Sequence, residues 1–148
     1  MTLPDRLASD AQIFVVDDNA QNRELMAAYL DEVGGSVRLF VNGVEALAAC
    51  DSGMPDLVLL DIMMPGTSGF QVCERLRALP GGAGIPVLML TALNEVADVE
   101  RAIEAGATDF LIKPVNRAEL LTRVTALLAV RSVANRTDRA IADLRSLA

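Results

Sequence analysis

Four short apolar runs of the sequence end at, or directly before, residues that could bind a metal ion or an anion. Asp17 and Asp18 follow the run IFVV, Asp61 ends DLVLLD, and Thr91 ends IPVLMLT. Lys113 ends a further run, TDFLIK, and is the only lysine in a chain that has twelve arginines. If these runs are parallel strands of one sheet, their carboxyl ends meet at one edge. Three carboxylates, a hydroxyl and an ammonium group would then lie together.

Such a set of side chains predicts a magnesium site. Crowded carboxylates repel one another and raise one another's pKa. Mg²⁺ relieves that repulsion and prefers oxygen ligands, commonly one or two carboxylates with a phosphate oxygen. A lysine ammonium pairs with a carboxylate or a phosphoryl oxygen. Each residue alone has a structural explanation, since Asp and Thr after a strand are common caps and turn formers. The ordered set favours a site.

The elements that must position these residues alternate along the chain. Predicted strands at 13–17, 36–41, 56–61, 85–91 and 108–113 are followed by predicted helices at 23–33, 43–50, 70–79, 95–106 and 116–130. Strict alternation implies a doubly wound α/β fold, in which a parallel sheet has helices on both faces. The first, third and fourth strands are almost continuously apolar, as strands covered on both faces are. The second alternates, which indicates an edge strand.

Composition excludes several classes of function. The chain has 148 residues, the size of one domain, and contains no histidine, so histidine-based metal sites and Ser-His-Asp triads are excluded. A net charge of −7 argues against nucleic-acid binding by this chain. No apolar run is long enough for a membrane span, and the N-terminus lacks a signal-peptide pattern. We therefore expect a cytoplasmic protein whose two cysteines, Cys50 and Cys73, are buried and reduced.

Residues 131–148 contain no Gly or Pro and extend the last predicted helix. Spacings of four and three residues separate the members of a weak heptad seam: Val130, Ala134, Thr137, Ile141, Leu144 and Ala148. One interpretation is an amphipathic tail that frays or lies on the domain. The other is a stalk that pairs with a second copy as a homodimer or leads to another domain. Because the sequence ends inside a helical run, we expect a piece of a longer protein.

The strand ends lie within four longer motifs, FVVDDNAQNRELM, PDLVLLDIMMPGTSGF, PVLMLTA and GATDFLIKP. In this order and spacing they resemble the receiver domain of two-component response regulators, over residues 12 to about 130. The resemblance implies a flavodoxin-like (βα)5 sheet with strand order 2-1-3-4-5. Residues 1–11 would form an N-terminal extension, 12–130 the receiver domain and 131–148 a helical extension.

The resemblance also implies site roles. Asp61 would be the nucleophile that accepts a phosphoryl group. Mg²⁺ would be held by Asp17, Asp18, Asp61 and the backbone carbonyl of Met63. Thr91 would donate a hydrogen bond to one phosphoryl oxygen.

Lys113 would pair with a second phosphoryl oxygen. Phe110 stands at the position of the family's aromatic switch residue, which turns inward as Thr91 moves toward the phosphoryl group. The peptide bond before Pro114 would be cis. Ser68 departs from the family, where an Asp is usual, but it lies outside the expected metal site.

We therefore expect a phosphorylation-controlled switch rather than a multiple-turnover enzyme. The donor would be a phosphohistidine on a histidine kinase or a histidine phosphotransfer protein, and any output enzyme would lie outside this chain. Output would pass through the face of the fourth helix, fifth strand and fifth helix, and through the C-terminal helix. Met63 and Leu93 stand two residues beyond Asp61 and Thr91. Neither apolar side chain can orient an attacking water, so we expect slow loss of the phosphoryl group.

Three alternatives remain open. The chain could be a stand-alone module that binds a protein partner without an effector domain. It could be a phosphate-ester hydrolase of similar topology, although such enzymes usually have a second Asp where this chain has Met63. It could also be a receiver that has lost phosphorylation, against which the complete set of site residues argues.

Overall fold

The computed structural model describes residues 11–92 and 96–146. Its five strands form one parallel sheet, as the alternation predicted, in the order β2-β1-β3-β4-β5 that the resemblance implied. The strands are β1 (Gln12–Val16), β2 (Ser36–Phe40), β3 (Leu57–Asp61), β4 (Val87–Thr91) and β5 (Asp109–Ile112). The flavodoxin-like (βα)5 fold is thereby confirmed.

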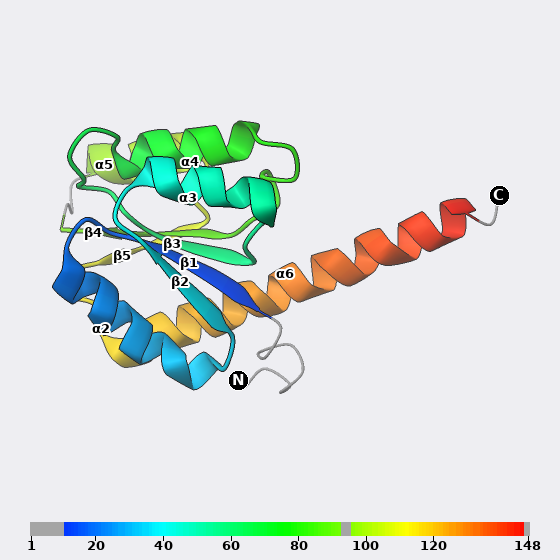
Figure 1. Ribbon diagram of the computed structural model, residues 1–148, viewed down its shortest axis with the longest axis horizontal. Coiled ribbons are helices and arrows are strands. Elements are labelled where there is room, and N and C mark those ends of the chain that lie inside the picture. The colour runs from blue at the N-terminus through cyan, green and yellow to red at the C-terminus, as the bar shows by residue number, and fades with distance from the viewer. Residues whose placement is uncertain (1–10, 93–95, 147–148) are drawn as a thin grey trace.

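Helices cover both faces of the sheet (Figure 1). They are α2 (Ala20–Leu30), α3 (Gly43–Ala49), α4 (Gly69–Ala78), α5 (Val96–Glu104) and α6 (Arg117–Ser146), with short 3₁₀ turns at η1 (Asp31–Val33) and η2 (Cys50–Ser52). Helices α3, α4 and α5 lie on one face, and α2 and α6 on the other. Parallel sheets need this double cover, because both faces of their strands are apolar.

The alternation of side chains along each strand produces two separate cores. On the face of α3, α4 and α5, Phe14, Leu60 and Met89 are almost fully buried. On the opposite face, Ile13 and Leu59 pack with residues of α2 and α6. Every residue of β3 and β4 is buried, which explains why these runs contain hardly any polar residues.

Side-chain caps determine where several helices begin. Helix α2 starts at Ala20, three residues before the predicted start, because the side chain of Asn19 accepts a hydrogen bond from Asn22 N. Ser68 and Gln71 form a reciprocal capping box at α4, so the residue that departs from the family has a structural role. Asn116 caps α6 by accepting a hydrogen bond from Glu119 N at 3.0 Å.

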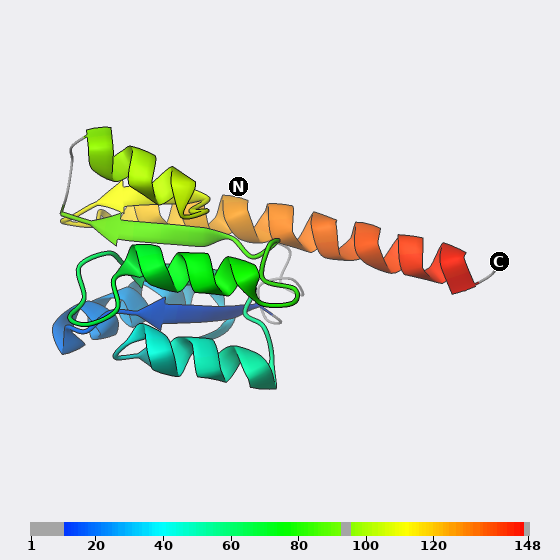
Figure 2. The ribbon, with the colours of Figure 1, turned by 90° about the horizontal axis from the view of Figure 1, so that it is seen from above.

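Helix α6 is one continuous helix of 30 residues, which confirms the predicted extension. Its first half packs on the sheet through Leu120, Val124 and Leu128, and its second half projects beyond the domain (Figures 1 and 2). Within residues 11–92 and 96–146, no helix combines the length and the hydropathy of a membrane span. Leu93, Ala148 and nearly all of the predicted extension 1–11 lie outside the described residues.

Candidate functional site

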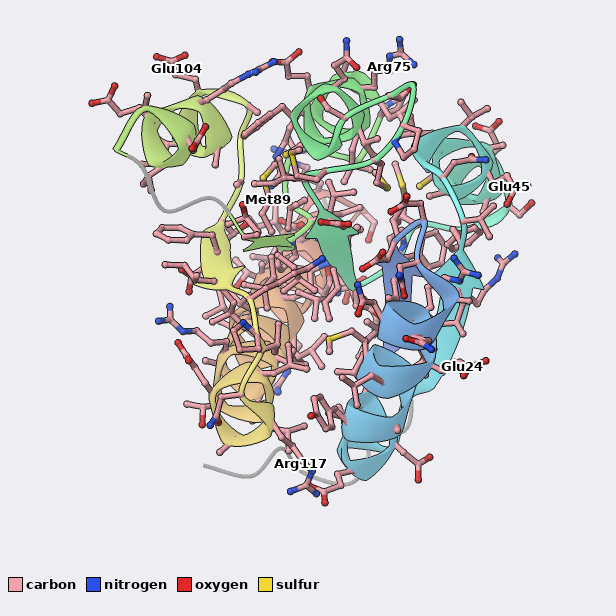
Figure 3. The ribbon with its side chains drawn as sticks, turned by 90° about the vertical axis from the view of Figure 1, so that its left-hand side faces the viewer. Glu24, Glu45, Arg75, Met89, Glu104 and Arg117 are labelled. Atoms are coloured by element: carbon pink, nitrogen blue, oxygen red, sulfur yellow. The ribbon has the colours of Figure 1, made fainter. Side chains whose placement is uncertain are left out.

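The predicted site residues lie at one edge of the sheet, where the strands end. Asp17 follows β1, Asp61 is the last residue of β3, Thr91 is the last residue of β4, and Lys113 follows β5. A backbone hydrogen bond from Lys113 N to Thr91 O, at 2.7 Å, places Thr91 and Lys113 side by side at this edge. Figure 3 views the molecule from this edge, and the charged side chains labelled on the surrounding helices, such as Glu24, point outward.

The sheet brings the three aspartates together, as the sequence predicted. One carboxylate oxygen from each of Asp17, Asp18 and Asp61 lies within 4.8 Å of the others. Lys113 Nζ lies 3.2 Å from Asp61 Oδ1 and 3.7 Å from Asp17 Oδ2. Asp17 and Asp61 are only 1% and 4% exposed, whereas Asp18 is exposed. The site therefore has a buried, lysine-paired part and a part that solvent can reach.

Backbone and side-chain hydrogen bonds fix the position of Asp17. Its Oδ1 accepts a hydrogen bond from Asn19 N at 2.9 Å, and Arg23 Nη1 donates to its backbone carbonyl at 2.7 Å. Arg23 and Asn19 were missed as site residues in the sequence. Both stand inside the motif FVVDDNAQNRELM, so their proximity to the aspartates was the available signal.

The environment of Asp61 favours its protonated form. Burial raises the pKa of the Asp61 carboxyl, and the nearby Asp17 carboxylate raises it further. The Lys113 ammonium and the Met63 N–H, which donates to Asp61 Oδ1 at 3.3 Å, act in the opposite direction and lower this pKa. Since the net pKa shift is upward, the lysine only partly offsets the cost of a second buried carboxylate.

The carboxylates fit a hard divalent cation. Asp17 Oδ2 is buried and accepts no hydrogen bond in the described part of the chain, and Lys113 Nζ, at 3.7 Å, forms an ion pair with it but lies beyond hydrogen-bond distance. A buried carboxylate oxygen in this state is stabilised by a cation that binds it directly. The three carboxylates of this cluster supply the oxygen ligands that Mg²⁺ prefers. The residues present therefore match the predicted ion.

Gly69 is a further site residue that the sequence did not reveal. A Cβ atom at this position would lie 2.5 Å from the carbonyl oxygen of Asp61 and 2.8 Å from Cα of Ile62. Both neighbours are backbone atoms that cannot rotate away. Only glycine lets the N-terminus of α4 approach the end of β3 this closely, and Gly69 N donates to Ile62 O at 3.0 Å.

The remaining predicted residues surround this cluster. Thr91 is buried, with 3% of its surface exposed, at the end of β4. Phe110 is half-buried on β5 and packs against the core on the side of α3, α4 and α5. The Met63 side chain is 60% exposed. The bond between Lys113 and Pro114 is cis, as the resemblance implied. The switch role of Phe110 and the ligand role of the Met63 carbonyl stay predictions.

Known proteins share this arrangement. Residues 13–125 match the family described as the response regulator receiver domain. The DNA-binding dual master transcriptional regulator RpaA of Synechocystis is 41% identical over 128 residues, which are 86% of this chain and 51% of RpaA. The response regulator PleD of Caulobacter vibrioides is 41% identical over 123 residues, 83% of this chain and 27% of PleD. The chain thus spans about half of RpaA and about a quarter of PleD.

A solved structure is similar in both fold and sequence. The receiver domain of the sensor histidine kinase PA1611 from Pseudomonas aeruginosa PAO1 superposes with a TM-score of 0.75 at 30% identity. The match covers 81% of this chain and 98% of that domain. That structure has a magnesium ion coordinated in its active-site cleft.

Proposed function

Because the chain belongs to the response regulator receiver family, we propose that it is a signalling switch that accepts a phosphoryl group on Asp61. The observation that supports this most directly is the buried contact between Asp61 and Lys113, at 3.2 Å, within a cluster of three carboxylates. Receiver domains are phosphorylated by histidine kinases, so a phosphohistidine of a kinase or of a phosphotransfer protein is the proposed donor.

Magnesium is the proposed cofactor. Asp17, Asp18, Asp61 and the carbonyl of Met63 would hold it, and the buried Asp17 Oδ2, which accepts no hydrogen bond and has only Lys113 Nζ at 3.7 Å, supports this assignment. The magnesium ion in the related PA1611 domain supports it as well. When bound, Mg²⁺ offsets negative charge on the phosphoryl oxygens.

The chain's own residues would carry the transfer. An Asp61 oxygen attacks phosphorus, so that a carboxyl O–P bond forms as the N–P bond of the phosphohistidine breaks, and the histidine nitrogen leaves with the electron pair. Lys113 moves its pairing from the carboxylate to a phosphoryl oxygen, and the Thr91 hydroxyl donates to another. The acyl phosphate carries about −1.5 to −2 charge. We propose that this charge biases β5, with Phe110, and the adjoining helices toward a second arrangement.

A phosphorylation assay tests this proposal. Wild type, Asp61→Asn and Asp51→Asn are incubated with phosphoramidate and Mg²⁺, and the phosphorylated fraction is separated on a phosphate-affinity gel. Asp51 is exposed on η2 outside the carboxylate cluster and serves as the matched control. We expect phosphorylation of wild type and of Asp51→Asn, and none of Asp61→Asn. Modification that persists in Asp61→Asn, or that requires no Mg²⁺, would reject the assignment.

A cytoplasmic location stays a prediction.

A further inference from the structure

The second half of α6 leaves the domain at a defined point. Arg131 is the anchor, since its Nε lies 3.8 Å from Asp56 Oδ1 and its Nη1 donates to the carbonyl of Gly84 at 3.4 Å. Residues 132–146, here called the arm, project away from the sheet edge opposite the aspartates (Figures 1 and 2). Among the described residues, no hydrogen bond or ion pair joins the arm to the domain.

An apolar stripe begins at this point and runs along the arm. Val130, Val133 and Leu144 are 67%, 60% and 67% exposed, and Ile141 is 43% exposed. Smaller exposed residues, namely Ala134, Thr137 and Ala140, fill the positions between them. The spacings of three and four residues place all seven on one side of the helix. The structure thus leaves a continuous apolar stripe uncovered.

Intrinsic helix propensity does not account for a stable arm. Because the arm continues a helix that is already packed on the sheet, it needs no nucleation of its own, and its stability depends on residue propensities and on its own contacts. The stripe contains the β-branched residues Val133, Thr137 and Ile141, which are weaker helix formers than Ala or Leu. Most helical stability in proteins comes from packing of the apolar face. A partner surface that covers the stripe would therefore stabilise the arm.

We propose that the stripe pairs with the same stripe of a second copy of this chain, with the two arms parallel. This inference goes beyond the proposed function and does not depend on the chemistry at Asp61. In a parallel two-fold pair each stripe residue packs in the same layer as its own copy, so that Ile141 meets Ile141 and Leu144 meets Leu144. In a parallel pair, Asp138 of one arm flanks Val133 of the other, and Arg145 flanks Ala140. No like charges meet.

An antiparallel pair places like charges together. In the antiparallel alignment with the fullest overlap, Thr137 packs in the same layer as Ile141 of the other copy. The two Asp138 carboxylates then lie side by side, and Arg131 lies beside Arg145 of the other copy. Like charges at these flanking positions are destabilising. Charge therefore favours the parallel arrangement.

The parallel arrangement has a consequence for ionic strength. Residues 131–148 carry four Arg and two Asp, which is a net charge of +2. Because the whole chain has a net charge of −7, residues 1–130 have a net charge of −9. Parallel arms bring two acidic domains to the same end of the dimer, where they repel each other. Added salt screens that repulsion. Dimerisation is therefore expected to tighten as salt increases, whereas docking of a basic arm onto an acidic domain would weaken.

The dimer is expected to be weak. About 24 Å of paired helix, some 16 residues at 1.5 Å each, is short for a coiled coil. A pairing of this length is expected to bury less than the roughly 800 Å² per partner of a stable interface. Association should therefore be sought at protein concentrations of up to about 1 mM.

Sedimentation equilibrium of the unphosphorylated full chain, at low and high salt, tests the pairing. We expect a monomer–dimer equilibrium that tightens with salt. Ile141→Gln and Leu144→Gln should each weaken it by about tenfold or more, since each removes a large apolar contact. Ala142→Gln is the matched control, because Ala142 is exposed and lies off the stripe. Far-UV circular dichroism verifies that the domain stays folded.

Disulfide trapping tests the orientation. The natural thiols, Cys50 and Cys73, are buried, so a cysteine introduced on the arm is the reactive one. Leu144→Cys should form a cross-linked dimer under mild oxidation, because parallel arms bring equivalent positions together. Arg139→Cys, on the opposite side of the helix, should not. A monomer at all concentrations, association that weakens with salt, or failure of Leu144→Cys to cross-link would each overturn the proposal.

Discussion

Lys113 supplies the positive charge that makes the buried aspartates tolerable, and replacing it by methionine should destabilise the protein. Methionine keeps an unbranched apolar stem but removes the charge. At separations of 3.2 Å and 3.7 Å, the attractions to Asp61 and Asp17 are about 5 and about 4 kcal/mol for an effective dielectric constant of about 20. Lys113 is itself 26% exposed, so solvent screening and its own desolvation reduce these values. We expect Lys113→Met to lower the free energy of unfolding by about 2–4 kcal/mol.

Urea denaturation in EDTA at pH 7 measures this change. Far-UV circular dichroism is the suitable probe because the chain has no tryptophan. The matched experiment introduces Asp61→Asn into wild type and into the Lys113→Met variant. In the Lys113→Met background, Asp61→Asn should restore about 1–2 kcal/mol, because it removes a buried carboxylate that has lost its counter-charge.

The pH dependence provides an independent check on the same pair. Because the pKa of Asp61 in the folded protein lies above its ordinary value of 3.8, the folded state binds the proton more tightly than the unfolded state. The cost of ionising Asp61 therefore builds up as pH rises from 3.8 through the raised pKa, and disappears as pH falls back through that window. Below that pH window, the decrease in the free energy of unfolding caused by Lys113→Met should be much smaller. A defect of less than about 0.5 kcal/mol at pH 7, or one that does not change with pH, would refute the reasoning.

Further predictions concern Gly69, with Gly84 as its control, and Met63 and Ser68. Gly69→Ala should destabilise the fold by about 2–4 kcal/mol and impair phosphorylation, because its Cβ would collide with the Asp61 backbone. Gly84→Ala, whose Cβ would meet only the Arg131 side chain at 3.3 Å, should be nearly neutral by the same urea assay. Met63→Asn should accelerate loss of the phosphoryl group, since an amide can orient water where the exposed methionine cannot; wild-type decay within seconds would contradict this. Ser68→Ala should cost about 1 kcal/mol of stability through loss of the α4 cap, with the phosphorylation rate unchanged.

Most of the fold could be predicted from the sequence because each signal was local. Continuous apolar runs indicated buried parallel strands, and the absence of Gly and Pro from residues 131–148 indicated that the last helix continues past residue 130. The clustering of Asp17, Asp18 and Asp61 then followed from topology alone, since parallel strands end at one edge.

The remaining features depend on contacts between segments that are distant in the sequence. Gly69 matters only because α4 returns to the backbone of β3, a distance that no spacing pattern encodes. The direction of the arm depends on how Leu120, Val124 and Leu128 pack against the sheet, and Arg131 meets Asp56 and Gly84 only where the arm leaves the domain. The start of α2 was placed three residues late because Asn19 was not recognised as a cap. The roles of Thr91, Phe110 and the Met63 carbonyl came from resemblance and stay predictions.

The uninterrupted length of α6 has a mechanical consequence. A helix without a proline or glycine behaves as a stiff rod, and thirty residues make one about 45 Å long. It begins at Arg117, close to Lys113, and passes a fulcrum at Arg131. A tilt of about 5° at that fulcrum would sweep its far tip by about 2 Å, since some 22 Å of rod lies beyond it. About 21 Å of the same helix lies on the near side of Arg131, so a movement of about 2 Å at Arg117 would appear as an equal and opposite movement of the tip.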